Sequence, residues 1–149
     1  MRRVLPALLL SVLPLAAQST LVSVIRQPRA TAAEFTVPVT EFALKDGGDF
    51  ARLHLGVGLG ARHWDDGDNA LRFVADATAT AKDLFLGLGA IVEVPSGDGA
   101  YFGPRLRVGW AFHPNLALSL EGEHLEKPFA DGIHPKRRSS LGLVLTVNF

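Results

Sequence analysis

The chain has 149 residues, a length that fits one domain. Its 15 basic and 15 acidic residues balance, which argues against a uniformly basic, nucleic-acid-binding surface. The lack of cysteine excludes disulfides, thiolate metal sites, a cysteine nucleophile and a lipidated cysteine.

The N-terminal segment has the pattern of a secretory signal peptide. Arg2 and Arg3 form a basic start, an apolar stretch follows, and Ala16 and Ala17 are small residues of the kind that precede a cleavage site. The alternative is an uncleaved membrane anchor, but the apolar stretch is short for a transmembrane helix and contains two prolines. We therefore expect a signal peptide over residues 1–17 and a single mature domain over residues 18–149.

The rest of the chain alternates apolar and polar residues with period two, which indicates β-strands. No run of about twenty apolar residues remains, so no transmembrane helix is expected. Two weaker strands are predicted near Thr20–Arg26 and Glu34–Leu44. Six clearer strands follow, at Arg52–Arg62, Leu71–Thr80, Leu84–Val94, Tyr101–Phe112, Leu116–Glu123 and Ser139–Phe149. The predicted fold is all-β, an antiparallel up-and-down transmembrane β-barrel with eight strands.

The links between the predicted strands alternate in length. Short links are expected at Lys82–Asp83 and His113–Asn115, and longer ones at His63–Asn69, Pro95–Ala100 and Glu126–Arg138. Short turns on the periplasmic side and longer loops outside are typical of membrane barrels.

One face of the predicted strands is almost entirely Leu, Val, Ala and Phe, and its aromatic residues gather near strand ends. Trp110, Phe112 and Phe149 fall at one end and Phe102 at the other, as in the aromatic girdles of a lipid-facing wall. We therefore expect this face to point outward. A soluble, lipocalin-like barrel in the periplasm would reverse the two faces and place the Leu-rich face around a ligand.

The opposite face carries glycine, small polar residues and charges. In a narrow barrel these charges would form a paired internal network, because buried charges need partners. The predicted network consists of Arg52, Arg62, Arg72, Asp76, Glu93, Arg105, Arg107, Glu121 and Glu123.

The last strand resembles the C-terminal signal of bacterial outer-membrane barrels, with alternating apolar residues and a terminal aromatic. The stretch Arg105–Leu120 is similar to a strand–turn–strand unit of small OmpA-like and OmpW-like barrels. This resemblance implies that the protein lies in the cell outer membrane as a monomer, surrounded by outer-membrane lipids and lipopolysaccharide. It also implies that the barrel assembly machinery is a partner. The assembly signal would be Leu141, Leu143, Leu145, Val147 and Phe149.

Two features depart from this pattern. Pro38 and Glu41 lie within the second strand, and Glu41 falls on the lipid-facing side unless a bulge near Pro38 turns it inward. The alternative is that residues 18–33 form no strand. No peptidoglycan-binding domain is expected after the barrel.

Some small barrels modify lipid A, which needs a nucleophile next to a base. The sequence has no His-x-Ser motif, and the pieces it offers are His124, Glu123, Ser139 and Ser140. The acidic residues 65–69 fit a solvated turn better than a calcium loop. A basic cluster on the longest loop is a candidate for contact with lipopolysaccharide phosphates, through Lys136, Arg137 and Arg138.

The sequence therefore predicts a non-enzymatic barrel with a structural, surface or narrow-pore role. A lipid A-modifying enzyme and a soluble binding barrel remain the alternatives. No cofactor, metal or nucleic-acid partner is expected.

Overall fold

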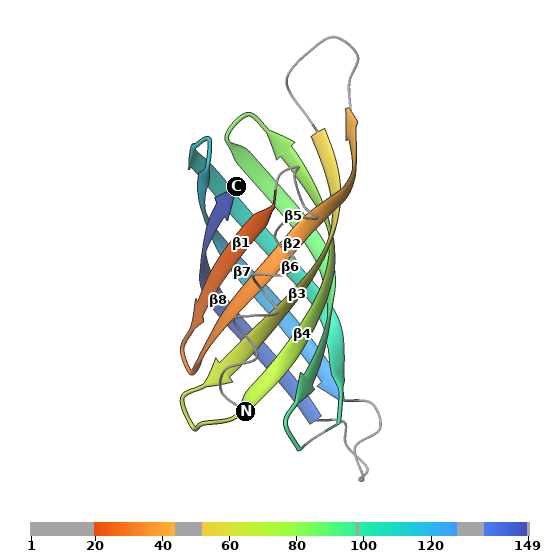
Figure 1. Cartoon of the computed structure of the whole chain (residues 1–149), viewed down its shortest axis with the longest axis vertical. Helices are drawn as coiled ribbons and strands as arrows, with labels where there is room; N and C mark the ends of the chain where they lie inside the picture. The colour runs from red at the N-terminus through yellow and green to blue at the C-terminus, as the bar shows by residue number, and fades with distance from the viewer. Residues whose placement is uncertain (1–19, 44–51, 98, 128–135, 149) are drawn as a thin grey trace.

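The computed structural model describes residues 20–43, 52–97, 99–127 and 136–148, which form a closed antiparallel β-barrel (Figure 1). Each strand pairs with the next along the chain, and β1 closes the barrel against β8. Closure leaves no unpaired strand edge, which is the condition for placing a sheet in a bilayer. The predicted eight-stranded up-and-down barrel is confirmed. Its strands are β1 (Leu21–Gln27), β2 (Ala30–Ala43), β3 (Arg52–Trp64), β4 (Asn69–Ala81), β5 (Leu84–Pro95), β6 (Tyr101–His113), β7 (Leu116–Lys127) and β8 (Lys136–Asn148).

The two ends of the barrel differ in their links. We call the end where Leu21 pairs with Asn148 the proximal end, which lies at the top of Figure 1, and the opposite end the distal end. From β3 onward, short proximal links alternate with longer distal ones, as predicted. The first two links depart from this alternation, because only Pro28 and Arg29 separate β1 from β2 at the distal end and residues 44–51 separate β2 from β3 at the proximal end.

Two strands begin earlier than the sequence pattern indicated. β2 starts at Ala30, where a run of small residues gives little alternation, yet Ala32 packs inside against Ile25 and Val144. β8 starts at Lys136, so the predicted loop Glu126–Arg138 is partly strand. The predicted signal peptide and Phe149 lie outside the described residues. Among the residues that the structure describes, no helix is long and apolar enough to cross a membrane.

The register of β2 shifts between Pro38 and Thr40, and this shift is a β-bulge. Proline cannot donate a ladder hydrogen bond, so a bulge is a natural place for it in a strand. The extra residue reverses the side-chain parity beyond it. Glu41 therefore turns inward and pairs in register with His54. This is the orientation predicted for Glu41 if a bulge lies near Pro38.

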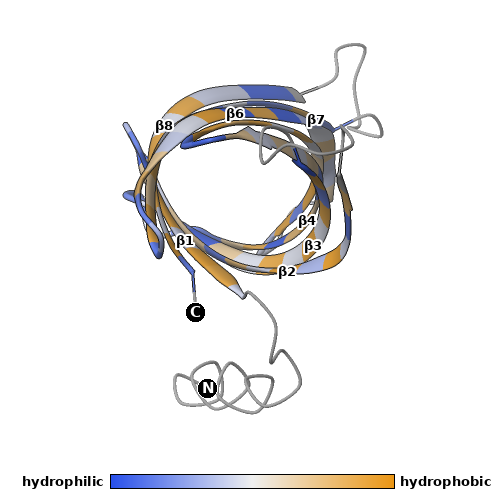
Figure 2. Cartoon of the chain, turned by 90° about the horizontal axis from the view of Figure 1, so that it is seen from above, coloured by the Kyte–Doolittle hydropathy of each residue, from blue (hydrophilic) through white to orange (hydrophobic). Residues whose placement is uncertain are grey.

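The Leu-rich face points outward in all eight strands, and the charged face points inward. Seen from above in Figure 2, apolar and polar residues alternate along the strands that form the ring. Leu84 and Leu141 are each 63% exposed, whereas Arg72, Glu93 and Glu121 are 0% exposed. Such a continuous apolar exterior is what a lipid-facing wall presents. The face assignment from the sequence is confirmed, and the inverted, lipocalin-like arrangement is wrong.

Candidate functional site

Charged side chains from several strands meet in the middle of the barrel interior and form a set of ion pairs that we call the central belt. One half of this belt is centred on Arg72 and Arg62. The Nε atom of Arg72 lies 3.2 Å from Oε1 of Glu34, and its Nη2 atom lies 2.7 Å from Oε2 of Glu123. Arg62 places Nη1 2.8 Å from Oε2 of Glu93 and also bonds Glu123. These five residues come from five different strands, so their ion pairs tie opposite walls together.

The other half of the central belt is built in the same way. Nη1 of Arg105 lies 2.7 Å from Oε2 of Glu34, and the same guanidinium bonds Asp76. Arg107 donates from Nε to Oε2 of Glu121 at 2.9 Å. Buried charges are tolerated only when they are paired, and here each guanidinium contacts at least two carboxylates. The belt comprises Arg62, Arg72, Arg105, Arg107, Glu34, Asp76, Glu93, Glu121 and Glu123.

The belt differs from the predicted network at two positions. Arg52 is not part of it. The side chain of Arg52 is half-exposed at the proximal end, where Nη1 lies 3.2 Å from Oε1 of Glu41. Glu34 is a full member that the sequence interpretation missed, because the weak alternation of β2 did not assign it to a face.

A further cation closes the belt at its distal side. Arg138 places its guanidinium 4.3 Å from the ring centre of Tyr101 and 5.0 Å from that of Trp64, and Nη1 lies 3.7 Å from Oε1 of Glu93. Stacking on two aromatic rings is a favourable cation–π arrangement. With Arg138 included, five guanidiniums face five carboxylates, so the interior charge balances.

The predicted basic cluster is therefore divided by the strand. Because residues 136–138 lie in β8 and not in a loop, the side chains of Arg137 and Arg138 take opposite faces. Arg138 faces the barrel mouth, whereas Arg137 points outward and is 62% exposed. The side chain of Lys136 lies outside the described part of the structure. A single patch made by all three side chains is not formed.

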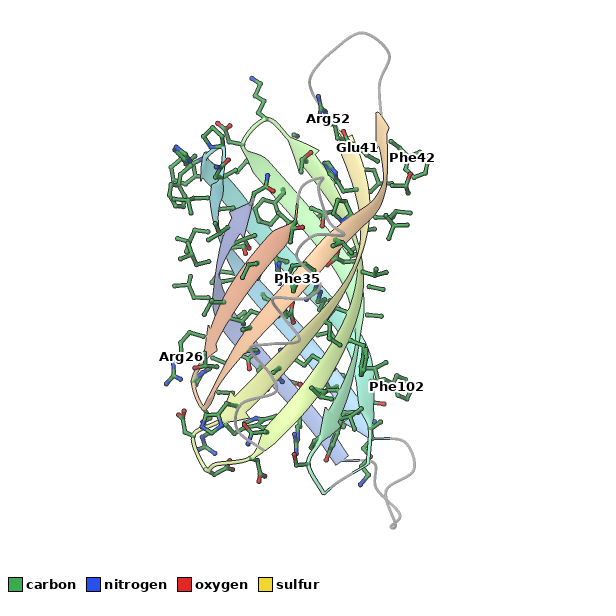
Figure 3. All side chains as sticks on the ribbon, viewed as in Figure 1. Arg26, Phe35, Glu41, Phe42, Arg52 and Phe102 are labelled. Carbon is green, nitrogen blue, oxygen red and sulfur yellow. The ribbon has the colours of Figure 1, made fainter. Side chains whose placement is uncertain are left out.

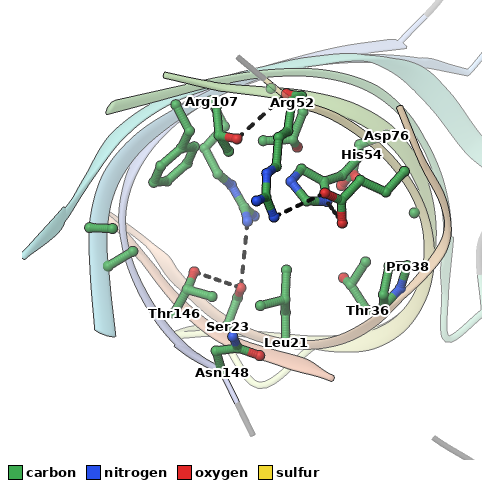
Figure 4. Close-up of a pocket in the computed structure, with 18 of the residues that line it drawn as sticks. Leu21, Ser23, Thr36, Pro38, Arg52, His54, Asp76, Arg107, Thr146 and Asn148 are labelled. Carbon is green, nitrogen blue, oxygen red and sulfur yellow. Dashed lines mark hydrogen bonds and ion pairs between the residues drawn. The ribbon is translucent and has the colours of Figure 1, made fainter. Parts of the chain in front are cut away.

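A cavity of about 550 Å³ lies between the belt and the proximal end. Figure 4 looks into it, with Arg52 and His54 on one side and Ser23 and Thr146 on the other. The Ser23 and Thr146 hydroxyls lie 2.9 Å apart. The cavity ends at Arg107, Arg105 and Asp76, which are belt residues. The belt therefore separates it from the distal mouth.

A second polar cluster lies on the outward face near the distal end. Nδ1 of His124 is 2.6 Å from Oγ of Ser139, and Nε2 of the same ring is 3.3 Å from Oε1 of Glu126. His124 and Ser139 are direct cross-strand partners on β7 and β8, and Glu126 follows two residues later on the same face as His124. A hydroxyl, an imidazole and a carboxylate in this order are the parts of an activated serine nucleophile.

Arg137 holds the carboxylate of this cluster. Its Nε donates to Oε1 of Glu126 at 2.9 Å, and the two residues are also register partners. Glu126 is thus fixed between a guanidinium and the imidazole of His124. We call Ser139, His124 and Glu126 the outer triad. On its other side, Glu126 pairs with Phe102, which Figure 3 labels on the outer surface of the distal half.

Two of the residues considered for a catalytic site lie inside the barrel instead. Glu123 belongs to the central belt, and Ser140 donates from Oγ to Oε1 of Glu123 at 2.7 Å. The sequence interpretation considered a base and a nucleophile within one strand, the His-x-Ser motif, which the chain lacks. The signal it missed was His124 and Glu126 at a spacing of two, with Ser139 placed opposite by the β7–β8 register.

The acidic turn is held by its own backbone. The Trp64 amide donates to the Asp68 carbonyl at 2.9 Å, the Asp68 amide donates to Oδ1 of Asp66 at 3.3 Å, and Gly67 adopts a φ of 101°. Within the described residues, no group of three or more His, Asp and Glu side chains is arranged to hold a metal ion.

The predicted assembly signal occupies the outward face of the last strand. Leu141, Leu143 and Leu145 are exposed, Val147 is half-buried, and Phe149 lies outside the described residues. Its recognition by assembly machinery remains a prediction.

The barrel is similar to two solved structures. The crystal structure of the outer membrane enzyme PagL matches with a TM-score of 0.61 and 14% identity, over 87% of this chain and 99% of that chain. A de novo designed transmembrane β-barrel matches with a TM-score of 0.50 and 14% identity, over 88% and 93% of the two chains. No protein-family profile and no curated protein matches the sequence. These likenesses show an outer-membrane-type barrel fold, and the finer resemblance to OmpA-like and OmpW-like barrels remains a prediction.

Proposed function

We propose that this protein is an outer-membrane serine hydrolase that cleaves an ester-linked acyl chain from a lipid of the outer leaflet, with lipid A as the expected substrate class. The observation that carries the proposal is the 2.6 Å contact between Nδ1 of His124 and Oγ of Ser139, with Glu126 on the other ring nitrogen. The proposal replaces the non-enzymatic role that the sequence favoured. It adopts the alternative of a lipid A-modifying barrel.

The reaction follows from the order of the three groups. Oγ of Ser139 attacks the ester carbonyl carbon while His124 takes the hydroxyl proton, and Glu126 stabilises the imidazolium that forms. The imidazolium then returns the proton to the departing alcohol, which leaves an acyl-serine. Water, deprotonated by His124, attacks this acyl group and releases the fatty acid, and Ser139 regains its proton.

The position of the outer triad favours a lipid substrate. It lies on the Leu-rich outer wall, next to Phe102 and near the distal end, where an aromatic belt and the membrane interface are expected. If the proximal end faces the periplasm, the distal end reaches the outer leaflet. An ester bond of a membrane lipid lies at that depth, between its headgroup and its acyl chains.

Arg137 suits the headgroup side of such a substrate. Its guanidinium is largely exposed while its Nε holds Glu126, which leaves other N–H groups for a phosphate oxygen. Of the three basic residues considered for lipopolysaccharide contact, we therefore propose Arg137 as the one that serves this site.

The PagL likeness is consistent with an enzyme on this fold, but at 14% identity it carries no residue-level argument. A non-enzymatic structural role is the second candidate, and the filled central belt favours it over a pore. Charge pairs that span the lumen leave the proximal cavity without a continuation to the distal mouth.

The test is the lipid composition of a Gram-negative host that expresses the full chain. Lipid A is extracted and its mass compared for wild type, Ser139→Ala and Ser140→Ala, with the folded barrel verified by its mobility shift on boiling. We expect wild type and Ser140→Ala to release one acyl chain and Ser139→Ala to release none. Unchanged lipid A and phospholipid masses with folded wild-type barrel would overturn the proposal.

A further inference from the structure

Nine glycines lie within the described strands, and eight of them face the interior. At six of these eight, an added Cβ would meet another atom at less than 3.0 Å, and at Gly56 and Gly87 it would meet side-chain atoms at 3.1 and 3.2 Å, so packing disfavours a side chain at these positions. At Gly58, for example, a Cβ would lie 2.7 Å from both the Phe35 carbonyl oxygen and a methyl group of Val74. The interior glycines are Gly56, Gly58, Gly60, Gly87, Gly89, Gly103, Gly109 and Gly142.

Gly122 is different. It shares the outward parity of Leu120 and His124 on β7, and a Cβ added there would meet only Cδ1 of Leu141, at 4.0 Å. Packing therefore does not require glycine at this position. Glycine also weakens a strand compared with a residue that carries a side chain, and a lipid-facing wall favours Leu or Val.

The missing side chain leaves a dent in the outer wall. Its floor is the backbone of Gly122, and its sides are Leu106 and Leu141, the register partners of Gly122 on β6 and β8. Leu120 closes the proximal side. All three leucines are exposed, so their side chains form apolar walls around the dent.

The dent adjoins the outer triad directly. His124 follows Gly122 by two residues on the same face, and Ser139 precedes Leu141 by two residues on the neighbouring strand. Two residues of strand span about 7 Å. The dent therefore lies about 7 Å from the nucleophile, on the side facing the middle of the barrel wall, which is the direction an acyl chain would take from an ester at the interface.

We propose that the Gly122 dent seats methylenes of the scissile acyl chain that lie beyond the reach of a butyryl group, and so makes the outer triad selective for long-chain esters. This inference rests on the proposed hydrolase function. The occupant is the acyl chain of an outer-leaflet lipid, because the dent is walled by leucines, opens toward the bilayer and lies two strand residues from Ser139 on the same outer face.

The experiment measures ester hydrolysis by the purified, full-length barrel in detergent. The probes are p-nitrophenyl laurate and p-nitrophenyl butyrate, and the variants are Gly122→Leu, Gly122→Ala and Ser139→Ala. Ala90→Leu is the matched control, since it places the same leucine side chain on the outward face of β5. Because Gly122 has open space around it, both variants at this position should fold, which the mobility shift on boiling verifies.

We expect Gly122→Leu to lower kcat/KM for the laurate ester by about tenfold or more while the butyrate ester keeps nearly its full rate. Gly122→Ala should give a smaller loss, and Ala90→Leu none. If Ser139-dependent hydrolysis occurs but Gly122→Leu leaves the laurate-to-butyrate ratio unchanged, the acyl seat is wrong and the hydrolase stands. If wild type hydrolyses neither ester in a Ser139-dependent manner, the proposed function and the seat both fail.

Discussion

Nδ1 of His124 and Oγ of Ser139 lie 2.6 Å apart across the β7–β8 ladder, on an outer wall that is mostly apolar. Polar side chains are costly on a lipid-facing wall unless they serve a purpose or reach the interface. The same histidine also contacts Glu126, so the three groups form a connected arrangement. The predictions below test this arrangement and the barrel that carries it.

Glu126 is expected to orient and stabilise the imidazole of His124. Glu126→Gln keeps the shape of the side chain but removes the negative charge, and we expect kcat to fall about a hundredfold with little change in KM. Steady-state kinetics with a soluble ester checks this. An unaltered kcat would show that Glu126 takes no part in the reaction.

Arg137 is expected to act through Glu126 and through the substrate headgroup. Arg137→Ala should lower kcat about tenfold, and Arg137→Lys should recover only part of it, because lysine lacks the guanidinium fork. A lipid substrate with a phosphate headgroup should also show a raised KM, whereas a soluble neutral ester should not. Equal KM effects on both substrates would contradict the headgroup role.

The central belt should contribute strongly to stability. Arg72 is 0% exposed and faces Glu34 and Glu123, so Arg72→Met removes one of the cationic partners of these buried carboxylates and leaves the interior with excess negative charge. We expect a loss of about 3–5 kcal/mol in the free energy of unfolding. Urea unfolding of the barrel in lipid vesicles, followed by tryptophan fluorescence, measures it.

Arg52→Met is the matched control, because Arg52 is half-exposed at the proximal end and forms its ion pair with the half-exposed Glu41. Its loss should stay below about 1 kcal/mol. Similar losses for the two variants would mean that the belt is not the principal electrostatic support of the fold.

The inward and outward glycines should respond oppositely to substitution. Gly58→Val places a side chain where the Phe35 carbonyl and Val74 already lie, so the barrel should assemble poorly. Gly122→Val adds bulk to open space and should give a normally folded barrel. The fraction of heat-modifiable barrel in outer-membrane extracts measures both. Normal assembly of Gly58→Val would contradict the packing argument.

The filled belt also predicts that the barrel does not conduct. In planar bilayers at moderate salt, purified wild type should give no discrete current steps, since ion pairs from Arg72 and Arg105 span the lumen. Reproducible steps from the folded protein would favour the narrow-pore role instead.

The fold was accessible from the sequence because period-two alternation specifies which face each residue takes. The alternation is uninterrupted from Leu53 to Ala61 and from Leu141 to Val147. In both segments the structure places the Leu, Val and Ala residues at odd-numbered positions on the outward face. The bulge near Pro38 was also accessible, since Glu41 could turn inward only through it. The start of β2 was not, because a run of small residues has no strong periodicity.

The outer triad was not accessible in the same way. His124, Ser139 and Glu126 are close only because of the β7–β8 register, and the sequence pattern fixes faces but not which residues stand opposite each other. Arg138 was assigned to a loop because the last strand was predicted to begin only at Ser139. Because β8 begins at Lys136, the alternation of the strand places Arg138 at the distal mouth of the barrel and Arg137 on the outer face beside Glu126.

The most direct measurement is the reaction of the purified, folded barrel with an alkyl fluorophosphonate, followed by peptide mass mapping. Such a probe forms a bond only with a serine whose hydroxyl is activated by a base. We predict one adduct, on Ser139, which is absent in Ser139→Ala and forms far more slowly in His124→Ala. A folded barrel in which Ser139 stays unmodified, or is modified equally fast without His124, would contradict the assignment of this site as a serine hydrolase.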